Sequence, residues 1–133
     1  VLGSGRTDGR AQLVFFAAPD CPVCKSILPA FRSLAAAESG STEFLLASAG
    51  EDIEEHLRFI ADEGLQKFGY VLSDRLGMEL GISKLPYAVL LSPEGRVEAF
   101  GLVNTREHLE SLFEASERGV VSLQQYMMEG ERA

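Results

Sequence analysis

Cys21 and Cys24 are the two cysteines of the chain, and they stand at C-x-x-C spacing within PDCPVCKSILP, residues 19–29. Such a pair can form a redox-active disulfide, supply half the ligands of a zinc or copper site, or pack as small core residues. The loop that a disulfide would close is too short to restrict the unfolded chain much, so structural stabilisation is a poor reason for it. The two histidines, His56 and His108, fall inside expected amphipathic helices, where we expect surface or rim positions. The pattern therefore favours a dithiol redox pair.

The residues around the pair indicate how its two sulfurs differ. Pro22 suits the first position of a helix, because its missing N–H would have no partner there anyway. Cys21 then lies at or beside the N-cap, where free N–H groups and the helix dipole stabilise a thiolate. Cys24, one turn inside, is expected to be less exposed and to resolve the mixed disulfide. The negative charge of Asp20 opposes a thiolate at Cys21, and the positive charge of Lys25 favours one. We expect the helix terminus to have a larger effect than either charge, because its N–H groups contact the sulfur.

Strands and helices alternate along the chain. Continuous apolar runs predict buried strands, and apolar residues at helical spacing predict helices between them. The strands are expected at 13–16, 44–47, 68–72, 87–91 and 96–100, and the helices at 22–37, from about 51, at 74–81 and from about 104. This alternation implies parallel pairing with right-handed crossovers, and the last two strands form a hairpin. We therefore predict an α/β fold, a three-layer α/β/α sandwich with a mixed sheet and a terminal antiparallel hairpin.

Two of these helices have predicted starts. Ser48 or Gly50 could cap the second helix, and Asn104 with Glu107 resembles a capping box that starts the last one. The residues expected to face the core from the second helix are Ile53, Leu57 and Ile60.

Composition limits the class of protein. Hydrophobic residues make up 46% of the 133 residues, enough for a core, and the net charge of −8 makes nucleic acid an improbable partner. We divide the chain into a flexible lead-in at 1–11, one domain at 12–118 and an amphipathic tail at 119–133. The tail could pack on its own domain or bind a partner. The chain starts at Val1, so we expect that a leader or anchor of the parent protein has been trimmed.

Two long stretches resemble the thioredoxin superfamily. LVFFAAPDCPVCKSILPAF, residues 13–31, is similar to its first strand, active-site turn and helix, with Pro29 where that helix is usually kinked. GISKLPYAVLLSPEGRV, residues 81–97, is similar to its second signature. The resemblance implies a cis peptide bond at Pro86, and a Leu85 backbone exposed for strand-like pairing with a substrate peptide.

Further stretches narrow the resemblance. FGYVLSDRLGMELGI, residues 68–82, is similar to the periplasmic TlpA and redoxin branch. CPVCK, with GLVNTREHLESLFEA at 101–115 and GVVSLQQYM at 119–127, resembles the methylamine-utilisation accessory thioredoxin-like proteins. That family is implicated in maturing methylamine dehydrogenase, whose small subunit is disulfide-rich.

The resemblance implies a thiol–disulfide oxidoreductase or isomerase that acts on protein cysteines. It implies no cofactor beyond the redox-active disulfide, no metal, a periplasmic location, a membrane redox partner and an anchor absent from this chain. Two alternatives stay open: a TlpA-like reductant for cytochrome c or copper-site cysteines, and a non-catalytic assembly chaperone with this fold.

The chain departs from thioredoxin at several positions. Phe15 stands where thioredoxin has a buried acid that manages protons at the resolving cysteine, so proton transfer must use water or another group. Asp20 replaces a tryptophan, and Pro22-Val23 replaces Gly-Pro between the cysteines. That dipeptide helps tune reduction potentials, which range from about −270 to −120 mV in such proteins. Ala18 stands where related peroxiredoxins need a threonine, so peroxidase activity is not expected.

Overall fold

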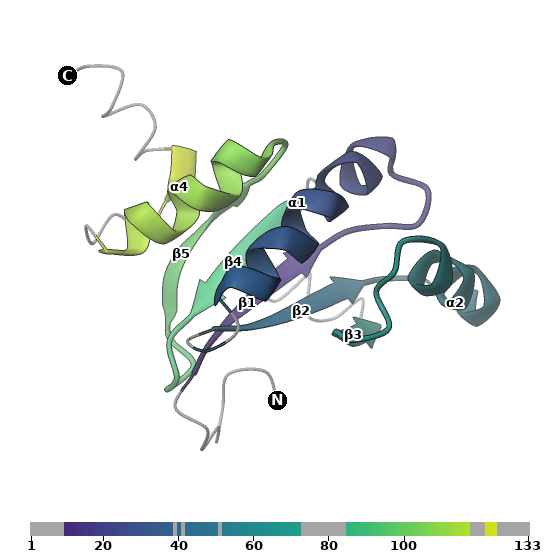
Figure 1. The fold of residues 1–133 in the computed structure, drawn as a ribbon, viewed down its shortest axis with the longest axis horizontal. Helices are drawn as coiled ribbons and strands as arrows, with labels where there is room; N and C mark the ends of the chain where they lie inside the picture. Colours follow the sequence, from purple (N-terminus) through teal and green to yellow (C-terminus); the bar gives the residue numbers. More distant parts are fainter. Residues whose placement is uncertain are drawn as a thin grey trace.

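The computed structural model describes residues 10–38, 40, 42–50, 52–72, 85–117 and 122–124. Strands and helices alternate up to residue 72, and a strand pair and a last helix follow from residue 87, as Figure 1 shows. The elements are β1 (Ala11–Phe16), α1 (Pro22–Glu38), β2 (Thr42–Ser48), α2 (Ile53–Asp62), β3 (Gly69–Leu72), β4 (Tyr87–Leu91), β5 (Val97–Leu102) and α4 (Arg106–Glu117). The short helix expected at 74–81 lies outside the described residues.

The strands form one mixed sheet of five, in the order β3-β2-β1-β4-β5. β1 pairs with β2, and β2 with β3, in parallel. β4 runs antiparallel to both β1 and β5. The predicted α/β fold, mixed sheet and closing hairpin are confirmed.

The central strand β1 is buried on both faces, which explains its continuous apolar sequence. Leu13 and Phe15 point into the core beneath α1 and α4, whereas Val14 and Phe16 belong to a separate cluster with side chains of β2 and β4. α1 and α4 lie over the first of these faces (Figure 1). The helix predicted at 74–81 lies outside the described residues, so the third layer of the sandwich stays a prediction.

The predicted core face of α2 is wrong at Ile53 and Leu57, whereas Ile60 is partly buried and packs against the core. Ile53 and Leu57 are 58% and 59% exposed, whereas His56 and Phe59 are 4% and 3% exposed. The helix is therefore rotated from the expected stripe, and an aromatic ring and an imidazole take the inward positions. An apolar pattern alone could not reveal this, because a histidine whose ring nitrogens are both hydrogen-bonded can be buried at little cost.

His56 has partners at both ring nitrogens. Its Nε2 lies 3.1 Å from the Ala49 carbonyl oxygen and its Nδ1 lies 2.7 Å from the Tyr70 hydroxyl oxygen. A carbonyl can only accept, so Nε2 carries the hydrogen, and in the neutral ring Nδ1 accepts from Tyr70. The surface or rim position expected for His56 is therefore wrong. His108 is partly exposed, as expected.

Both predicted helix caps are displaced. α2 is capped by Asp52, whose side chain accepts from the N–H of Glu55 at 3.1 Å. α4 is capped by Thr105, whose hydroxyl accepts from the N–H of His108 at 3.2 Å, while His108 Nδ1 accepts from the N–H of Asn104 at 3.0 Å. The N-cap thus lies one residue later than predicted, and His108 takes the place of the glutamate, but its ring accepts from the residue before the cap and not from the cap residue itself.

Part of the predicted tail lies along the edge of the sheet. Ser122 forms a parallel bridge with Phe100 of β5, and Leu123 is fully buried in the core. The Gln124 amide donates to the Leu102 carbonyl at 3.1 Å and accepts from the Leu102 N–H at 3.3 Å. Residues 122–124 therefore pack on this domain; Val120 and Met127 lie outside the described residues.

Candidate active site

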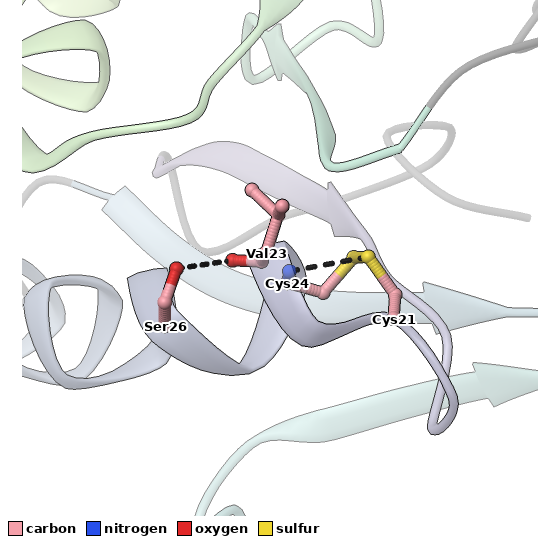
Figure 2. The surroundings of a disulfide bond; sticks show 4 residues. All are labelled: Cys21, Val23, Cys24 and Ser26. Carbon is pink, nitrogen blue, oxygen red and sulfur yellow. Dashed lines mark hydrogen bonds between the residues drawn. A yellow bond between two sulfur atoms is a disulfide. The ribbon is translucent and has the colours of Figure 1, made fainter.

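The two cysteines lie at the start of α1, after the turn that connects it to β1. Pro22 is the first residue of α1, as predicted, and the N–H of Lys25 donates to the Cys21 carbonyl at 3.1 Å. The N–H of Cys24 donates to the Cys21 sulfur at 3.1 Å (Figure 2). The Cys21 sulfur therefore accepts a hydrogen bond from an N–H of the first helical turn. When the pair is reduced, this contact and the helix dipole favour a negatively charged sulfur at Cys21.

The cysteines are joined as a disulfide, with their Cα atoms 5.2 Å apart (Figure 2). Cys24 is completely buried, whereas Cys21 is partly exposed. An attacking thiolate from outside can therefore reach the Cys21 sulfur, and the Cys24 sulfur is shielded. Within the described residues no group of three or more His, Cys, Asp or Glu side chains is placed to hold a metal ion.

The residues between the two cysteines expose apolar surface. Val23, between the cysteines, is 44% exposed, and its carbonyl accepts from the Ser26 hydroxyl at 2.7 Å (Figure 2). Pro22 is also exposed. The predicted dipeptide thus presents aliphatic surface to an approaching partner.

Leu85 and Pro86 reach the same end of the sheet as the cysteines. Tyr87, which follows them, pairs with Phe16 at the end of β1 that leads into the active-site turn. The Leu85–Pro86 peptide bond is cis, as the resemblance implied. Pro86 is buried and its carbonyl accepts from the Val103 N–H at 3.2 Å, whereas the Leu85 side chain is 41% exposed.

Phe15 occupies the position where an acid is usual in thioredoxin. Its side chain is fully buried in the same core cluster as Cys24, with its ring 5.2 Å from that of Phe31. No proton acceptor is therefore supplied from this position of β1. Asp20 and Lys25 are both exposed, so water screens their opposing effects on Cys21.

A cleft of about 270 Å³ opens beside the active-site turn, and the sequence analysis did not find it. Pro19 and Lys25 line one side, and α2 with its C-cap residue lines the other. Buried Pro19 and Phe59 supply its apolar surface. The only available signal was a row of charges at helical spacing, which is ordinary for an exposed helix. The charged side chains on the second side are Glu55, Arg58, Asp62 and Glu63.

Comparison with known proteins finds close relatives in sequence. The chain is 48% identical over 118 residues to the methylamine utilization protein MauD of Methylorubrum extorquens, covering 89% of this chain and 56% of the relative. It is 44% identical over 126 residues to MauD of Paracoccus denitrificans, covering 95% of this chain and 62% of the relative. The chain therefore spans roughly three fifths of the length of these relatives. No family model matches the chain.

Solved structures agree with the fold. StoA from Bacillus subtilis aligns with a TM-score of 0.66 and 27% identity, over 80% of this chain and 84% of that one. DsbF of Mycobacterium tuberculosis, described in mixed oxidized and reduced forms, aligns with a TM-score of 0.70 and 18% identity, over 81% of each chain. The chain thus has a thioredoxin-like fold with a Cys-x-x-Cys pair and, over the part of their length that it spans, is a homologue of the MauD methylamine utilization proteins.

Proposed function

We propose that this chain is the thiol–disulfide exchange domain of a periplasmic protein that forms or isomerises disulfides in the small subunit of methylamine dehydrogenase. The observation that carries the proposal is the Cys21–Cys24 disulfide at the start of α1, with the Cys24 N–H on the Cys21 sulfur. The named relatives connect the chain with methylamine utilization. The client is taken from the family resemblance, because disulfide-rich subunits need this chemistry.

The exchange proceeds in two displacements. A client thiolate attacks the Cys21 sulfur, which forms a mixed disulfide, and Cys24 leaves with the electron pair and takes up a proton. A second client thiolate then attacks the client sulfur of the mixed disulfide, and Cys21 leaves as a thiolate. Two electrons pass from the client dithiol to the Cys21–Cys24 pair. The N–H groups at the start of α1 stabilise the departing Cys21 thiolate, and a better leaving group speeds the second step.

Binding of the client uses the apolar surface around the pair. Val23, between the cysteines, is 44% exposed, and Leu85, two residues before the partner of Phe16 at the end of β1, is 41% exposed. We propose that an extended client segment pairs with the Leu85 backbone while the side chains of Val23 and Leu85 contact it. A membrane protein would reoxidise the pair. The expected anchor stays a prediction, and no helix in the described stretches is long and apolar enough to cross a membrane.

Trapping of a mixed disulfide tests the proposal. A Cys24→Ser variant is mixed with the subunit in its disulfide form, so that the Cys21 thiolate attacks a client disulfide and one client sulfur leaves as a thiolate. Cys24 is then absent and cannot release the mixed disulfide on Cys21, so the client subunit should accumulate as a covalent adduct. The matched Cys21→Ser variant keeps a buried thiol at Cys24 and should form none, because that sulfur is shielded. Non-reducing electrophoresis with mass spectrometry of the adduct gives the readout. Absence of any Cys21-dependent adduct with methylamine dehydrogenase small subunit would contradict the proposed client. Absence of an adduct with any cysteine-containing protein would contradict the activity.

The alternative function uses the same residues with electrons flowing in the opposite direction, from the Cys21–Cys24 dithiol to the cysteines of cytochrome c or of a copper site. The reduction potential of the Cys21–Cys24 couple decides between the two directions. A value near the oxidising end of the family range, about −120 mV, supports disulfide formation; one near −270 mV supports a reductant. The contact of the Cys21 sulfur with the start of α1 stabilises the reduced form, and thereby favours oxidation of the client.

A further inference from the structure

We propose that the cleft between the active-site turn and α2 is a specificity subsite, which receives a lysine or arginine side chain of the client near its reacting cysteine. This inference rests on the proposed exchange function and deepens it. The cleft has a volume of about 270 Å³, enough for one long side chain. Its position follows from its lining, because Pro19 stands just before Cys21 and Lys25 directly follows Cys24. A client residue within a few positions of the reacting cysteine can therefore reach it.

The lining suits a side chain with an aliphatic stem and a charged head. Pro19 is buried and Phe59 is 3% exposed, so these two residues supply apolar surface to the cleft. The residues that supply its charged side chains are more exposed. Lysine and arginine bury their methylene stems against apolar surface while their charged groups stay in water.

The charges favour a cation over an anion. The lining carries two cations, Lys25 and Arg58, and three carboxylates, a formal balance of −1, in a chain whose net charge is −8. The carboxylates belong to Glu55, Asp62 and Glu63, on the far side of the cleft from Lys25. None of these charged groups makes an ion pair within the part of the chain that the structure describes. They are therefore available to a partner, and the surplus of negative charge attracts a basic client segment.

Peptides with one variable residue test the inference directly. Each peptide carries a single cysteine as its mixed disulfide with thionitrobenzoate, and arginine, alanine or glutamate two residues from that cysteine on either side. The reduced Cys24→Ser variant attacks each peptide through Cys21, and release of thionitrobenzoate is followed by absorbance. Because exposed ion pairs are weak, we expect the arginine peptide to react about threefold faster than the alanine peptide. The glutamate peptide should be the slowest, and about 0.5 M salt should shrink the difference.

Two further variants assign the effect to the cleft. Asp62→Asn, in the Cys24→Ser background, should reduce the arginine-to-alanine ratio toward one. The matched change Glu94→Gln removes an exposed carboxylate in the β4–β5 turn, at the opposite end of β4 from Pro86, and should keep the ratio. Three results would each contradict the subsite and leave the exchange activity intact. They are equal rates for all three peptides, a glutamate peptide that reacts faster than the others, and an arginine-to-alanine ratio that Asp62→Asn does not change. If no peptide reacts with Cys21, the proposed function fails and the subsite fails with it.

Discussion

Leu123 offers a sharp test of whether the C-terminal segment belongs to the fold. Its side chain is completely buried, in a stretch for which the sequence left open both packing on its own domain and binding of a partner. Truncation of a buried leucine to alanine costs about 2–5 kcal/mol, because apolar contact is lost and a cavity remains. We therefore expect Leu123→Ala to lower the free energy of unfolding of the oxidised protein by about 3 kcal/mol.

The neighbouring Gln124 provides the control. Its side chain is exposed, and its amide makes two hydrogen bonds to the Leu102 backbone. Each such bond contributes about 0.5–1.5 kcal/mol, and the exposed Leu102 groups can bond to water instead, so Gln124→Ala should cost only about 1 kcal/mol. Urea denaturation followed by circular dichroism measures both variants against the unchanged protein.

A second substitution, at Gly101 in β5, tests the packing of the same C-terminal segment. A Cβ placed on Gly101 would lie 2.6 Å from the Leu123 Cβ and 2.6 Å from the Gln124 side-chain oxygen. Gly101→Ala should therefore destabilise the protein by about 1–3 kcal/mol through overpacking. In a chain that ends at residue 118 this cost should fall, because the atoms of Leu123 and Gln124 that conflict with the new Cβ are gone. Equal costs for Leu123→Ala and Gln124→Ala, or an unchanged cost of Gly101→Ala in the shortened chain, would refute the packing argument.

Three further predictions concern the surroundings of the site. Tyr70→Phe should cost about 1–3 kcal/mol, because buried His56 loses a hydrogen-bond partner. Burial raises the pKa of Tyr70 above 10.0, so the contribution of Tyr70 to the free energy of unfolding is complete below pH 10.0 and is lost as the pH rises through the folded-state pKa. In urea titrations across this range, the free energy of unfolding should therefore fall less in Tyr70→Phe than in the unchanged protein. Asp20→Asn should raise the alkylation rate of Cys21 at neutral pH by less than about threefold, measured with iodoacetamide in Cys24→Ser, since Asp20 is exposed. Asp52→Ala should lower the unfolding free energy by about 1 kcal/mol in urea titrations, through loss of the α2 cap.

Local chemistry explains what could be inferred about the cysteine pair. A proline after the first cysteine and a helical pattern beyond it were sufficient to place Cys21 at a helix start, since these preferences act within one turn. The observed contact between the Cys24 N–H and the Cys21 sulfur agrees with that inference. The cis bond before Pro86 came from family resemblance, because an X-Pro bond alone does not reveal its isomer.

The helix α2 shows where local reasoning stops. Its inward face is decided by Tyr70 and the Ala49 carbonyl, which lie on other segments and satisfy His56. No pattern within residues 53–62 contains those partners, so the apolar pair Ile53 and Leu57 was placed on the wrong side. The two helix caps were displaced for a similar reason, since several polar residues near each start could serve and geometry selects one.

The alternation of strands and helices, the buried central strand and the redox pair follow from residue type and spacing, because burial on both faces and helix starts leave periodic local signatures. The cleft is different. One side comes from the turn before α1 and the first turn of α1, and the other comes from α2 and its C-cap, some thirty residues or more further along the chain. Only the packing of α2 beside the active-site turn brings Lys25 to the same cleft as Glu55 and Asp62. A long-range arrangement of this kind depends on how helices pack on the sheet, and no local spacing of residues encodes it.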